Sequence, residues 1–250
     1  MKRGIVIVKI TVINGTSKKG ITYKIKEMLL NELRDYADIT EFYLPKDCPS
    51  FCTGCLNCVL KNEFSCKDSK YVQIIDESMR KADLLIFTCP TYVYHVTGAL
   101  KNMLDHFAYR WIIHKPAKEM FGKRAVIITQ CLGGGCAKAA KDIKDSLSWW
   151  GVSSIMIRKY KLMNSAGFDE ISEKRRSKIE KDLKKTAEKI KSIDYSKPSH
   201  TNISAKIKFF IVKNIQKNIS KTNPEYADYL YWKENGWMDG VKPWKNWWKL

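Results

Sequence analysis

The amino-acid sequence predicts an α/β protein built on a doubly wound, five-stranded parallel sheet. One observation is that short apolar runs rich in β-branched residues alternate with segments of helical periodicity as far as residue 195. A second is that 250 residues, 44% of them hydrophobic, are enough to bury a full core. Strands that alternate with helices form parallel sheets, which bind ligands at the carboxyl ends of their strands.

Apolar runs predict the five strands. They cover residues 5–14, 39–44, 83–89, 124–130 and 152–158. The first run is nearly continuous in β-branched side chains, as expected of a strand that is buried on both faces.

Helical periodicity predicts the segments between and after these strands. The helices cover residues 21–36, 70–81, 97–111, 136–150 and 169–193. In the first helix, the residues that share one apolar face are Ile21, Ile25, Met28, Leu29 and Leu33. The unusual loops all follow predicted strands, at residues 15–20, 45–69, 90–97 and 131–136. We therefore expect the chemistry at one edge of the sheet.

The sequence Lys-Pro-Ser-His at residues 197–200 separates a predicted domain, residues 1–195, from an extension, residues 196–250, that is not an independent domain. The extension carries an apolar stripe at helical spacing, formed by Ile203, Ile207, Phe210, Ile211, Ile215 and Ile219. We expect this helix to pack on the domain or on a partner subunit, with a membrane surface as the alternative. An aromatic tail follows and is expected to cover a site or a dimer interface; it contains Tyr226, Tyr229, Tyr231, Trp232, Trp237, Trp244, Trp247 and Trp248.

The formal net charge of +19 raises nucleic acid and membrane surfaces as candidate partners. Acidic residues are interspersed with the basic ones, however, and a nucleic-acid footprint should cluster, so no nucleic-acid partner is expected. The longest apolar runs fall well short of the roughly 20 residues of a transmembrane segment. No cleavage site follows the basic, then apolar, start of the chain. We therefore expect a cytoplasmic protein with reduced thiols, in which the eight cysteines serve metal, redox or packing roles.

The first loop, residues 14–22, reads N-G-T-S-K-K-G-I-T and joins a strand end to a helix start. Free N–H groups at a helix N-terminus, together with nearby hydroxyls, can bind a phosphate. An ordinary capped turn has the same composition, so this loop alone leaves both possibilities open.

The run T-C-P-T-Y-V-Y-H-V-T-G-A-L-K-N-M-L-D-H at residues 88–106 resembles the signature of the flavodoxin-like NAD(P)H-dependent FMN reductases. That signature reads threonine-x-proline-x-tyrosine, then a small residue, leucine-lysine and a closing aspartate. The sequence N-G-T-S-K at residues 14–18 is similar to the family's phosphate loop, asparagine-glycine-serine-proline-arginine. The resemblance covers about residues 8–160.

The resemblance implies that FMN is the cofactor, that NAD(P)H is the co-substrate, and that the protein is a homodimer with its sites at the interface. It implies phosphate contacts from Thr16, Ser17, Lys18 and Thr22. It implies a flavin wall formed by Pro90, Thr91, Tyr92, Val93 and Tyr94, and an opposite wall that includes Gln130, Gly133 and Gly134. Ser17 replaces the family's proline and Lys18 its arginine, and lysine lacks arginine's fork, so the detailed phosphate contacts stay open. Because the cofactor carries the chemistry, no catalytic acid or base is expected.

The loop at residues 45–69 holds the spacing Cys52-x2-Cys55-x2-Cys58-x7-Cys66. This spacing is similar to that of the iron–sulfur flavoproteins, relatives of the FMN reductases that carry a [4Fe–4S] cluster near the flavin. Relatives without a cluster have a comparable cysteine run, and four thiolates also suit zinc, so a cluster, zinc and no metal all stay open. The other cysteines, Cys48, Cys89, Cys131 and Cys136, are expected only to pack.

The sequence thus predicts an FMN-dependent oxidoreductase that passes electrons from NAD(P)H to a small molecule or a protein. The alternative is an iron–sulfur flavoprotein that acts as an electron carrier. A second alternative is a basic module that binds nucleic acid or a membrane surface.

Overall fold

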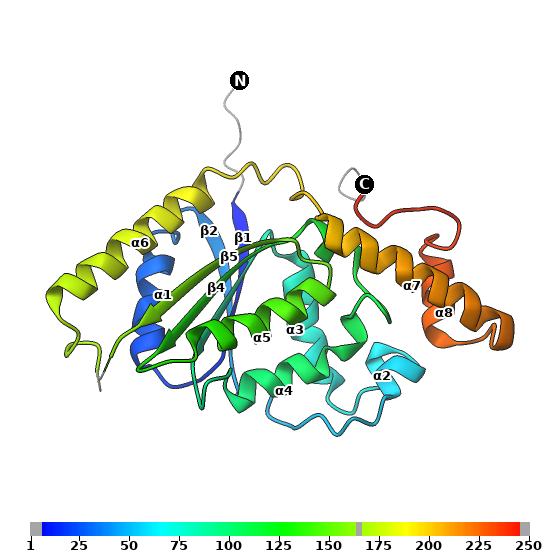
Figure 1. Ribbon diagram of the computed structural model, residues 1–250, viewed down its shortest axis with the longest axis horizontal. Coiled ribbons are helices and arrows are strands. Elements are labelled where there is room, and N and C mark those ends of the chain that lie inside the picture. Colours follow the sequence, from blue (N-terminus) through cyan, green and yellow to red (C-terminus); the bar gives the residue numbers. More distant parts are fainter. Residues whose placement is uncertain (1–6, 164–166, 246–250) are drawn as a thin grey trace.

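The computed structural model describes residues 7–163 and 167–245 (Figure 1). The five strands are β1 (Val8–Asn14), β2 (Ala37–Tyr43), β3 (Leu84–Pro90), β4 (Arg124–Cys131) and β5 (Ser154–Lys161). They form one sheet in the order β2-β1-β3-β4-β5, and every neighbouring pair is parallel. The predicted α/β class is therefore confirmed.

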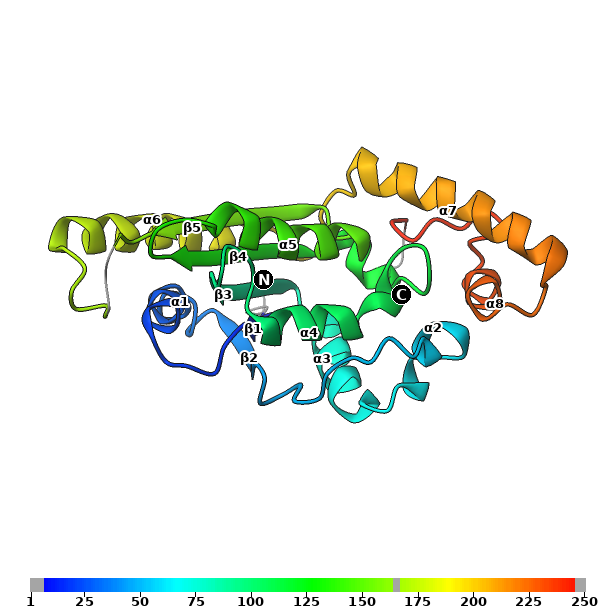
Figure 2. The same ribbon diagram turned by 60° about the horizontal axis from the view of Figure 1, so that its bottom comes forward.

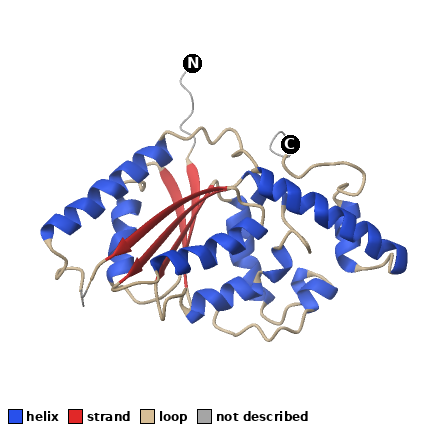
Figure 3. Ribbon diagram, in the orientation of Figure 1, coloured by secondary structure: helices blue, strands red, loops and turns tan. Residues whose placement is uncertain are grey.

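The longer helices within the domain are α1 (Ile21–Asn31), α3 (Ser69–Lys81), α4 (Gly98–His106), α5 (Cys136–Trp149) and α6 (Glu173–Lys191). Helices α1 and α6 cover one face of the sheet, and α3, α4 and α5 cover the other. Figure 3 shows the strands as a central layer between these two helical layers. The carboxyl ends of the strands meet at one edge, as predicted.

The position of β3 in the middle of the sheet explains why its sequence is an unbroken apolar run. Leu84 and Ile86 pack into the core beneath α1 and α6, whereas Leu85 and Phe87 pack into the core beneath α3, α4 and α5. Successive side chains of a strand point to opposite faces, so both sets must be apolar when helices cover both faces.

Several element boundaries differ from those predicted. Helix α1 ends at Asn31 rather than residue 36, because the chain turns over residues 32–36 to enter β2 while Leu33 stays buried. The predicted helix 97–111 is α4 followed by the short 3-10 helix η2 (Ala108–Arg110). The cysteine-rich loop contains α2 (Asn57–Leu60) and the 3-10 helix η1 (Glu63–Ser65), and η3 (Lys118–Gly122) precedes β4.

The extension forms α7 (Ile203–Thr222) and α8 (Ala227–Glu234) and builds a third core with the domain. The buried members of this core are Ile112, Phe121, Phe209, Val212, Trp232 and Trp237. The rings of Phe209 and Trp232 stack at 4.7 Å between centroids. Both helices lie at the right of Figure 1, away from the carboxyl ends of the strands. Trp247 and Trp248 lie outside the described residues.

Helix α7 packs on the domain, one of the two expected alternatives, but it does so through a face other than the predicted apolar stripe. Ile203, Ile207, Phe210, Ile211 and Ile215 are exposed, and the buried residues are Ala205, Phe209, Val212 and Gln216. The stripe repeats every four residues, whereas an α-helix completes a turn every 3.6 residues. The stripe therefore drifts around the helix, away from the buried face that contains Phe209, Val212 and Gln216. In the described parts of the chain, no helix is long and apolar enough to cross a bilayer.

Candidate active site

The loop between β1 and α1 is packed tightly against the end of β3. The Gly15 N–H donates to the Thr88 carbonyl oxygen at 2.7 Å, and the Thr97 hydroxyl donates to the Gly15 carbonyl oxygen. A Cβ atom on Gly15 would lie 2.9 Å from Cys89 Sγ and 3.1 Å from the Thr88 oxygen. Only glycine fits here without displacing its neighbours.

Asn14, at the end of β1, aligns the strand ends around this loop. Its side-chain nitrogen donates to the Phe42 carbonyl oxygen and to Glu41 Oε2, each at 3.1 Å, while its oxygen accepts from the Thr88 hydroxyl at 3.1 Å. Glu41 in turn binds the fully buried Lys26 ammonium at 2.6 Å. Burial alone would lower the pKa of Lys26, but its hydrogen bonds to acidic groups outweigh burial and leave that pKa raised.

A cleft of about 300 Å³ opens at this edge of the sheet. Its lining includes seven of the predicted FMN residues: Thr16, Lys18, Thr22, Pro90, Thr91, Tyr92 and Gln130. Gly20, Ile21 and Leu132 also line it, although the motif match did not single them out. Each lies within one or two residues of a predicted position. The sequence alone does not indicate which neighbouring residues of a loop face the cleft.

The remaining predicted FMN residues do not line this cleft. The Ser17 hydroxyl donates to the Leu44 carbonyl oxygen at 3.0 Å. Val93 and Tyr94 are exposed and have positive φ angles of 46° and 69°. A Cβ atom on Gly134 would lie 3.3 Å from the Tyr94 ring, whereas one on Gly133 would meet nothing within 4 Å.

Two features of the cleft fit a phosphorylated, polar cofactor such as FMN. Helix α1 begins at Ile21 with Gly20 as its N-cap, and no side chain caps it in the described structure, so its first N–H groups can serve an anion. The Thr91 hydroxyl is buried and has no hydrogen-bond partner among the described residues. Buried hydroxyls are normally satisfied, so this one fits a ligand atom in the cleft.

The loop that joins β4 to α5 corrects the expectation for two cysteines. Cys131 and Cys136 form a disulfide, with their Cα atoms 5.6 Å apart, rather than packing as free thiols. Three glycines lie between them, and Gly135 has a φ of +92°, which lets the chain reverse within so short a segment. Cys89 is a buried free thiol, as expected, and burial raises its pKa to about 11.

A second cleft, of about 320 Å³, contains the cysteine motif. Cys52, Cys55, Cys58 and Cys66 all line it, together with the unpredicted Asp68, Asp105 and His106. Cys48 is buried beside the motif but does not line the cleft, and burial raises its pKa to about 11.

His106 closes the inner side of this cleft. His106 Nδ1 lies 3.8 Å from Cys66 Sγ, and its Nε2 lies 3.0 Å from the Ser50 carbonyl oxygen. Asp68 Oδ2 is 3.9 Å from His106 Nε2, too far for a hydrogen bond. One ligand atom from each of Cys66, Asp68 and His106 falls within 4.8 Å of the others.

Side chains from α4 and η2 hold the cysteine loop. Asn102 accepts from the Cys52 N–H at 2.9 Å and donates to the Ser50 carbonyl oxygen at 2.8 Å. Arg110 forms a buried ion pair with Asp76 at 2.5 Å and reaches Glu63 of η1 at 3.4 Å. Contacts within the protein therefore hold the cysteine loop in place without a contribution from a metal.

The four thiols line one cleft, although the ligand atoms that converge within 4.8 Å among the described residues are those of Cys66, Asp68 and His106. Burial raises the pKa of Cys58, and the neighbouring Cys66 raises it further. Burial also raises the pKa of Cys66. Without a cation, gathering four thiolates here is unfavourable, and a bound metal removes that penalty because it stabilises the thiolate form.

Comparisons with known proteins agree with this geometry. The family model of the NADPH-dependent FMN reductases matches residues 8–169. An iron–sulfur flavoprotein of Clostridioides difficile (strain 630) is 31% identical over 187 residues, which are 70% of this chain and 76% of that protein. The azoreductase from Bacillus anthracis strain Sterne shares the fold, with a TM-score of 0.57 at 14% identity, covering 73% of this chain and all of that one. A flavone reductase structure has a TM-score of 0.55 at 12% identity and covers 94% of this chain and 98% of that one.

The family match spans both the loop at Gly15 and the run after β3 that line the first cleft. It favours redox chemistry over the basic binding module that the net charge had left open. The chain belongs to the NADPH-dependent FMN reductase family and is an FMN-dependent oxidoreductase that takes electrons from NAD(P)H.

Proposed function

We propose that the protein binds FMN in the first cleft and a [4Fe–4S] cluster on the cysteine loop, and that it delivers electrons to a small-molecule or protein acceptor. The observation that carries the proposal is that helix α4 connects the two clefts. Its N-cap residue Thr97 bonds Gly15 of the first loop, and its last residue His106 lies against Cys66. A nine-residue helix is about 13 Å long, so the two sites are close and rigidly connected.

Residues of the first cleft would bind FMN in two parts. Thr16, Lys18, Thr22 and the first N–H groups of α1 would hold the phosphate. Pro90, Thr91 and Tyr92 would line one side of the ring, and the strand end at Gln130 the other. When bound, FMN supplies the capacity to accept a hydride and to release electrons, so the protein's part is to position it.

Cys52, Cys55, Cys58 and Cys66 would be the cluster ligands. The relative from Clostridioides difficile supports iron–sulfur over zinc, because it is named an iron–sulfur flavoprotein and aligns with 70% of this chain. Compact spacing also supports a cluster, since one loop can supply all four thiolates. An FMN reductase without metal is the second candidate, and it is favoured only if iron is absent.

We further propose that the protein is a cytoplasmic homodimer and that a second copy covers the rim of the FMN cleft. Val93 is 92% exposed, and Tyr92 and Tyr94 beside it are also exposed. Apolar side chains held out in a strained, positive-φ turn are expected where a partner contacts them. A monomer in analytical ultracentrifugation at micromolar concentration would overturn this assembly.

Absorption spectra of anaerobically purified protein test the cofactors. We expect flavin bands near about 375 and about 450 nm, plus a broad shoulder that dithionite bleaches. We expect the Cys55→Ser variant to lose iron and acid-labile sulfide while retaining FMN, and the Cys48→Ser variant to retain both. A colourless protein that cannot be reconstituted with FMN would overturn the flavin site. Unchanged iron content in Cys55→Ser would overturn the cluster assignment.

A further inference from the structure

The C-terminal extension holds one short segment of the domain, residues 113–116. Gln216 of α7 donates to the Ile113 carbonyl oxygen at 3.0 Å. Trp232 of α8 donates to the His114 carbonyl oxygen at 2.7 Å, and the Tyr231 hydroxyl donates to the Pro116 carbonyl oxygen at 2.9 Å. Both helices of the extension therefore contact the same stretch of backbone. Figure 2 shows α8 close to α2.

A buried ion pair lies at the centre of this contact. Asp228 of α8 is fully buried, and its Oδ1 lies 2.7 Å from the Nζ of Lys115, which is 2% exposed. Asp228 Oδ2 lies 2.7 Å from Nδ1 of His114. A buried ammonium is costly unless it is paired, and Asp228 supplies the acidic partner for Lys115 at this position.

Lys115 uses its other two N–H groups on the cysteine loop. Its Nζ donates to the carbonyl oxygen of Cys58 at 3.3 Å and to that of Val59. These carbonyls belong to the one-turn helix α2, which leaves its C-terminal carbonyl groups without intrahelical partners. A cation is the favourable partner at a helix C-terminus, so the ammonium fixes the turn that presents Cys58.

We propose that Asp228 and Lys115 are positioning residues for the metal centre, and that the C-terminal extension is therefore a working part of that site. The chain of contacts runs from Asp228 through the Lys115 ammonium to the backbone of Cys58. This inference rests on the proposed cluster. Asp228 lies outside residues 8–169, the part of the chain that the family model matches.

The test separates positioning of the loop from a general structural role. The variants are Asp228→Asn, Lys115→Met and the double variant, with Glu234→Gln as a matched control on the exposed side of α8. Asp228→Asn leaves an unpaired buried ammonium and should lower the unfolding midpoint. The double variant buries no charge of this pair and should recover the midpoint, yet it lacks the donor for Cys58 and Val59.

Hydrogen exchange and iron content are then measured on the full chain. In the double variant, we expect amide exchange in residues 57–61 to rise by about tenfold or more, with exchange in residues 14–22 unchanged. We expect iron per chain to fall in that variant and to stay at the wild-type level in Glu234→Gln. Wild-type exchange and iron in the double variant would overturn the proposal, as would the same loss in the control. If the wild type binds no iron, the proposed cluster fails, while the exchange measurement still tests the contact.

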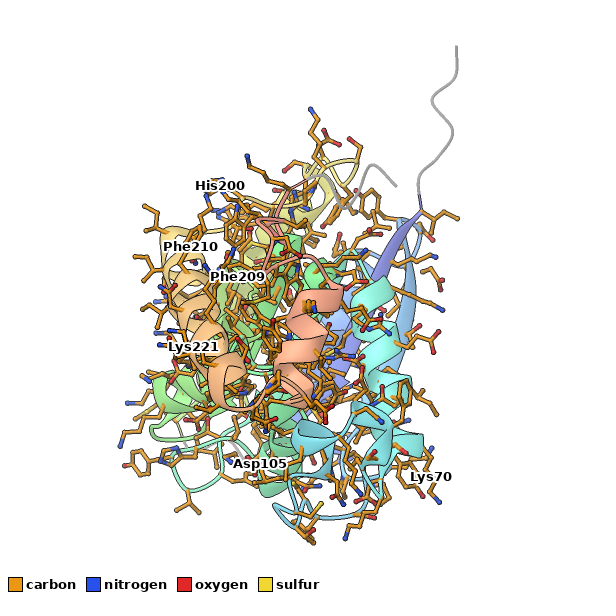
Figure 4. The ribbon with its side chains drawn as sticks, turned by 90° about the vertical axis from the view of Figure 1, so that its right-hand side faces the viewer. Lys70, Asp105, His200, Phe209, Phe210 and Lys221 are labelled. Carbon is orange, nitrogen blue, oxygen red and sulfur yellow. A yellow bond between two sulfur atoms is a disulfide. The ribbon has the colours of Figure 1, made fainter. Side chains whose placement is uncertain are left out.

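An independent observation concerns the outer surface of α7. Ile203, Ile207, Ile211 and Ile215 form an exposed ridge along the helix, with exposed fractions between 38% and 72%. Figure 4 shows Phe210 turned outward beside this ridge and Phe209 turned toward the body of the protein. Since Phe209 and Val212 anchor the opposite face in a core, the ridge is presented on a helix that is already folded.

The charge of α7 restricts what can cover the ridge. The helix contains five lysines and no acidic residue. Lys206, Lys213 and Lys217 follow the Phe210 side of the ridge at helical spacing. If two copies met through this face about a two-fold axis, the lysines of one copy would approach those of the other, which is unfavourable. An anionic surface would instead complement their positive charge.

We also propose that this face binds the surface of an anionic lipid bilayer. Isoleucine and phenylalanine would enter the headgroup boundary while lysines contact acidic headgroups, the arrangement of interfacial amphipathic helices. No ordering cost arises, because the helix is already anchored to the domain.

Sedimentation with vesicles tests this surface. We expect the full chain to pellet with vesicles of phosphatidylcholine and phosphatidylglycerol, not with phosphatidylcholine alone, and to pellet less as salt is added. An Ile207→Asp/Ile211→Asp variant should bind these vesicles about tenfold more weakly, or weaker still. The control Ile74→Asp, at an exposed isoleucine on α3, should leave vesicle binding unchanged. No pelleting of the wild type would overturn the proposal. The proposal would also be overturned if the Ile207→Asp/Ile211→Asp variant pelleted like the wild type. It would equally be overturned if that variant changed from dimer to monomer without losing vesicle binding.

Discussion

The Thr97 hydroxyl donates a hydrogen bond to the Gly15 carbonyl oxygen and accepts one from the Leu100 N–H. One buried side chain thus caps α4 and fixes the loop between β1 and α1 that lines the first cleft. The same helix ends at His106, beside Cys66. A change at Thr97 should therefore affect both the stability of α4 and the affinity for FMN.

We expect Thr97→Val to lower the free energy of unfolding by about 2 kcal/mol, because it removes a helix cap and leaves a buried carbonyl unpaired. FMN should bind about tenfold more weakly, since the loop at Gly15 loses its tether. Thr97→Ser retains the hydroxyl and serves as the control. Flavin fluorescence titration and urea unfolding measure the two effects. Wild-type FMN affinity in a folded Thr97→Val protein would contradict this role.

Gly15→Ala should be among the most damaging single-methyl changes in the first cleft. Its Cβ would lie 2.9 Å from Cys89 Sγ and 3.1 Å from the Thr88 carbonyl oxygen, so a neighbour must shift. Overpacking of this kind costs about 1–3 kcal/mol, measurable by urea unfolding. Adding Cys89→Ala removes the sulfur and should recover part of the loss, whereas Cys89→Ala alone provides the baseline. If the double variant is no more stable than Gly15→Ala, the sulfur contact is not the cause.

The central strands β1, β3 and β4 were predictable because they are covered on both faces and so appear as apolar runs, as Leu84 to Phe87 illustrate. The first cleft was partly predictable, since its loops follow strands directly. The buried face of α7 was not, because Phe209 packs on Trp232, a residue in another helix. Pairing of Lys115 with Asp228, 113 residues apart, likewise leaves no local pattern in the sequence.

The Cys131–Cys136 disulfide should stabilise the protein in the absence of reductant. It closes a short loop with a sequence separation of five residues, and constraint of such a loop in the unfolded chain is worth about 2 kcal/mol. We expect Cys131→Ala/Cys136→Ala to lose that amount in urea unfolding without reductant. Dithiothreitol should reduce wild-type stability toward that of the variant and leave the variant unchanged. Equal stabilities under oxidising conditions would show that the bridge contributes nothing.

The Lys26–Glu41 pair, at 2.6 Å, predicts a specific pH dependence of stability. Burial alone would raise the pKa of Glu41, but hydrogen bonds from Lys26 and Asn14 outweigh burial, so the folded-state pKa lies below the ordinary 4.5. A carboxylate whose pKa is lowered by folding contributes stability that is complete above the unfolded-state pKa. That contribution is lost as the pH falls through the folded-state pKa.

We therefore expect Glu41→Gln to lower the free energy of unfolding by about 1–3 kcal/mol at about pH 7, because it leaves the buried Lys26 with one fewer acidic partner. The difference between wild type and variant should shrink as the pH falls below about 4.5, where Glu41 becomes protonated in the unfolded chain, and it should disappear only once the pH is also below the lower folded-state pKa. Urea unfolding at a series of pH values measures it. Glu77→Gln, which removes an exposed pair with Lys81, is the control and should leave the free energy of unfolding nearly unchanged throughout. A difference that persists undiminished at the acid end would mean that Glu41 acts through packing rather than through its charge.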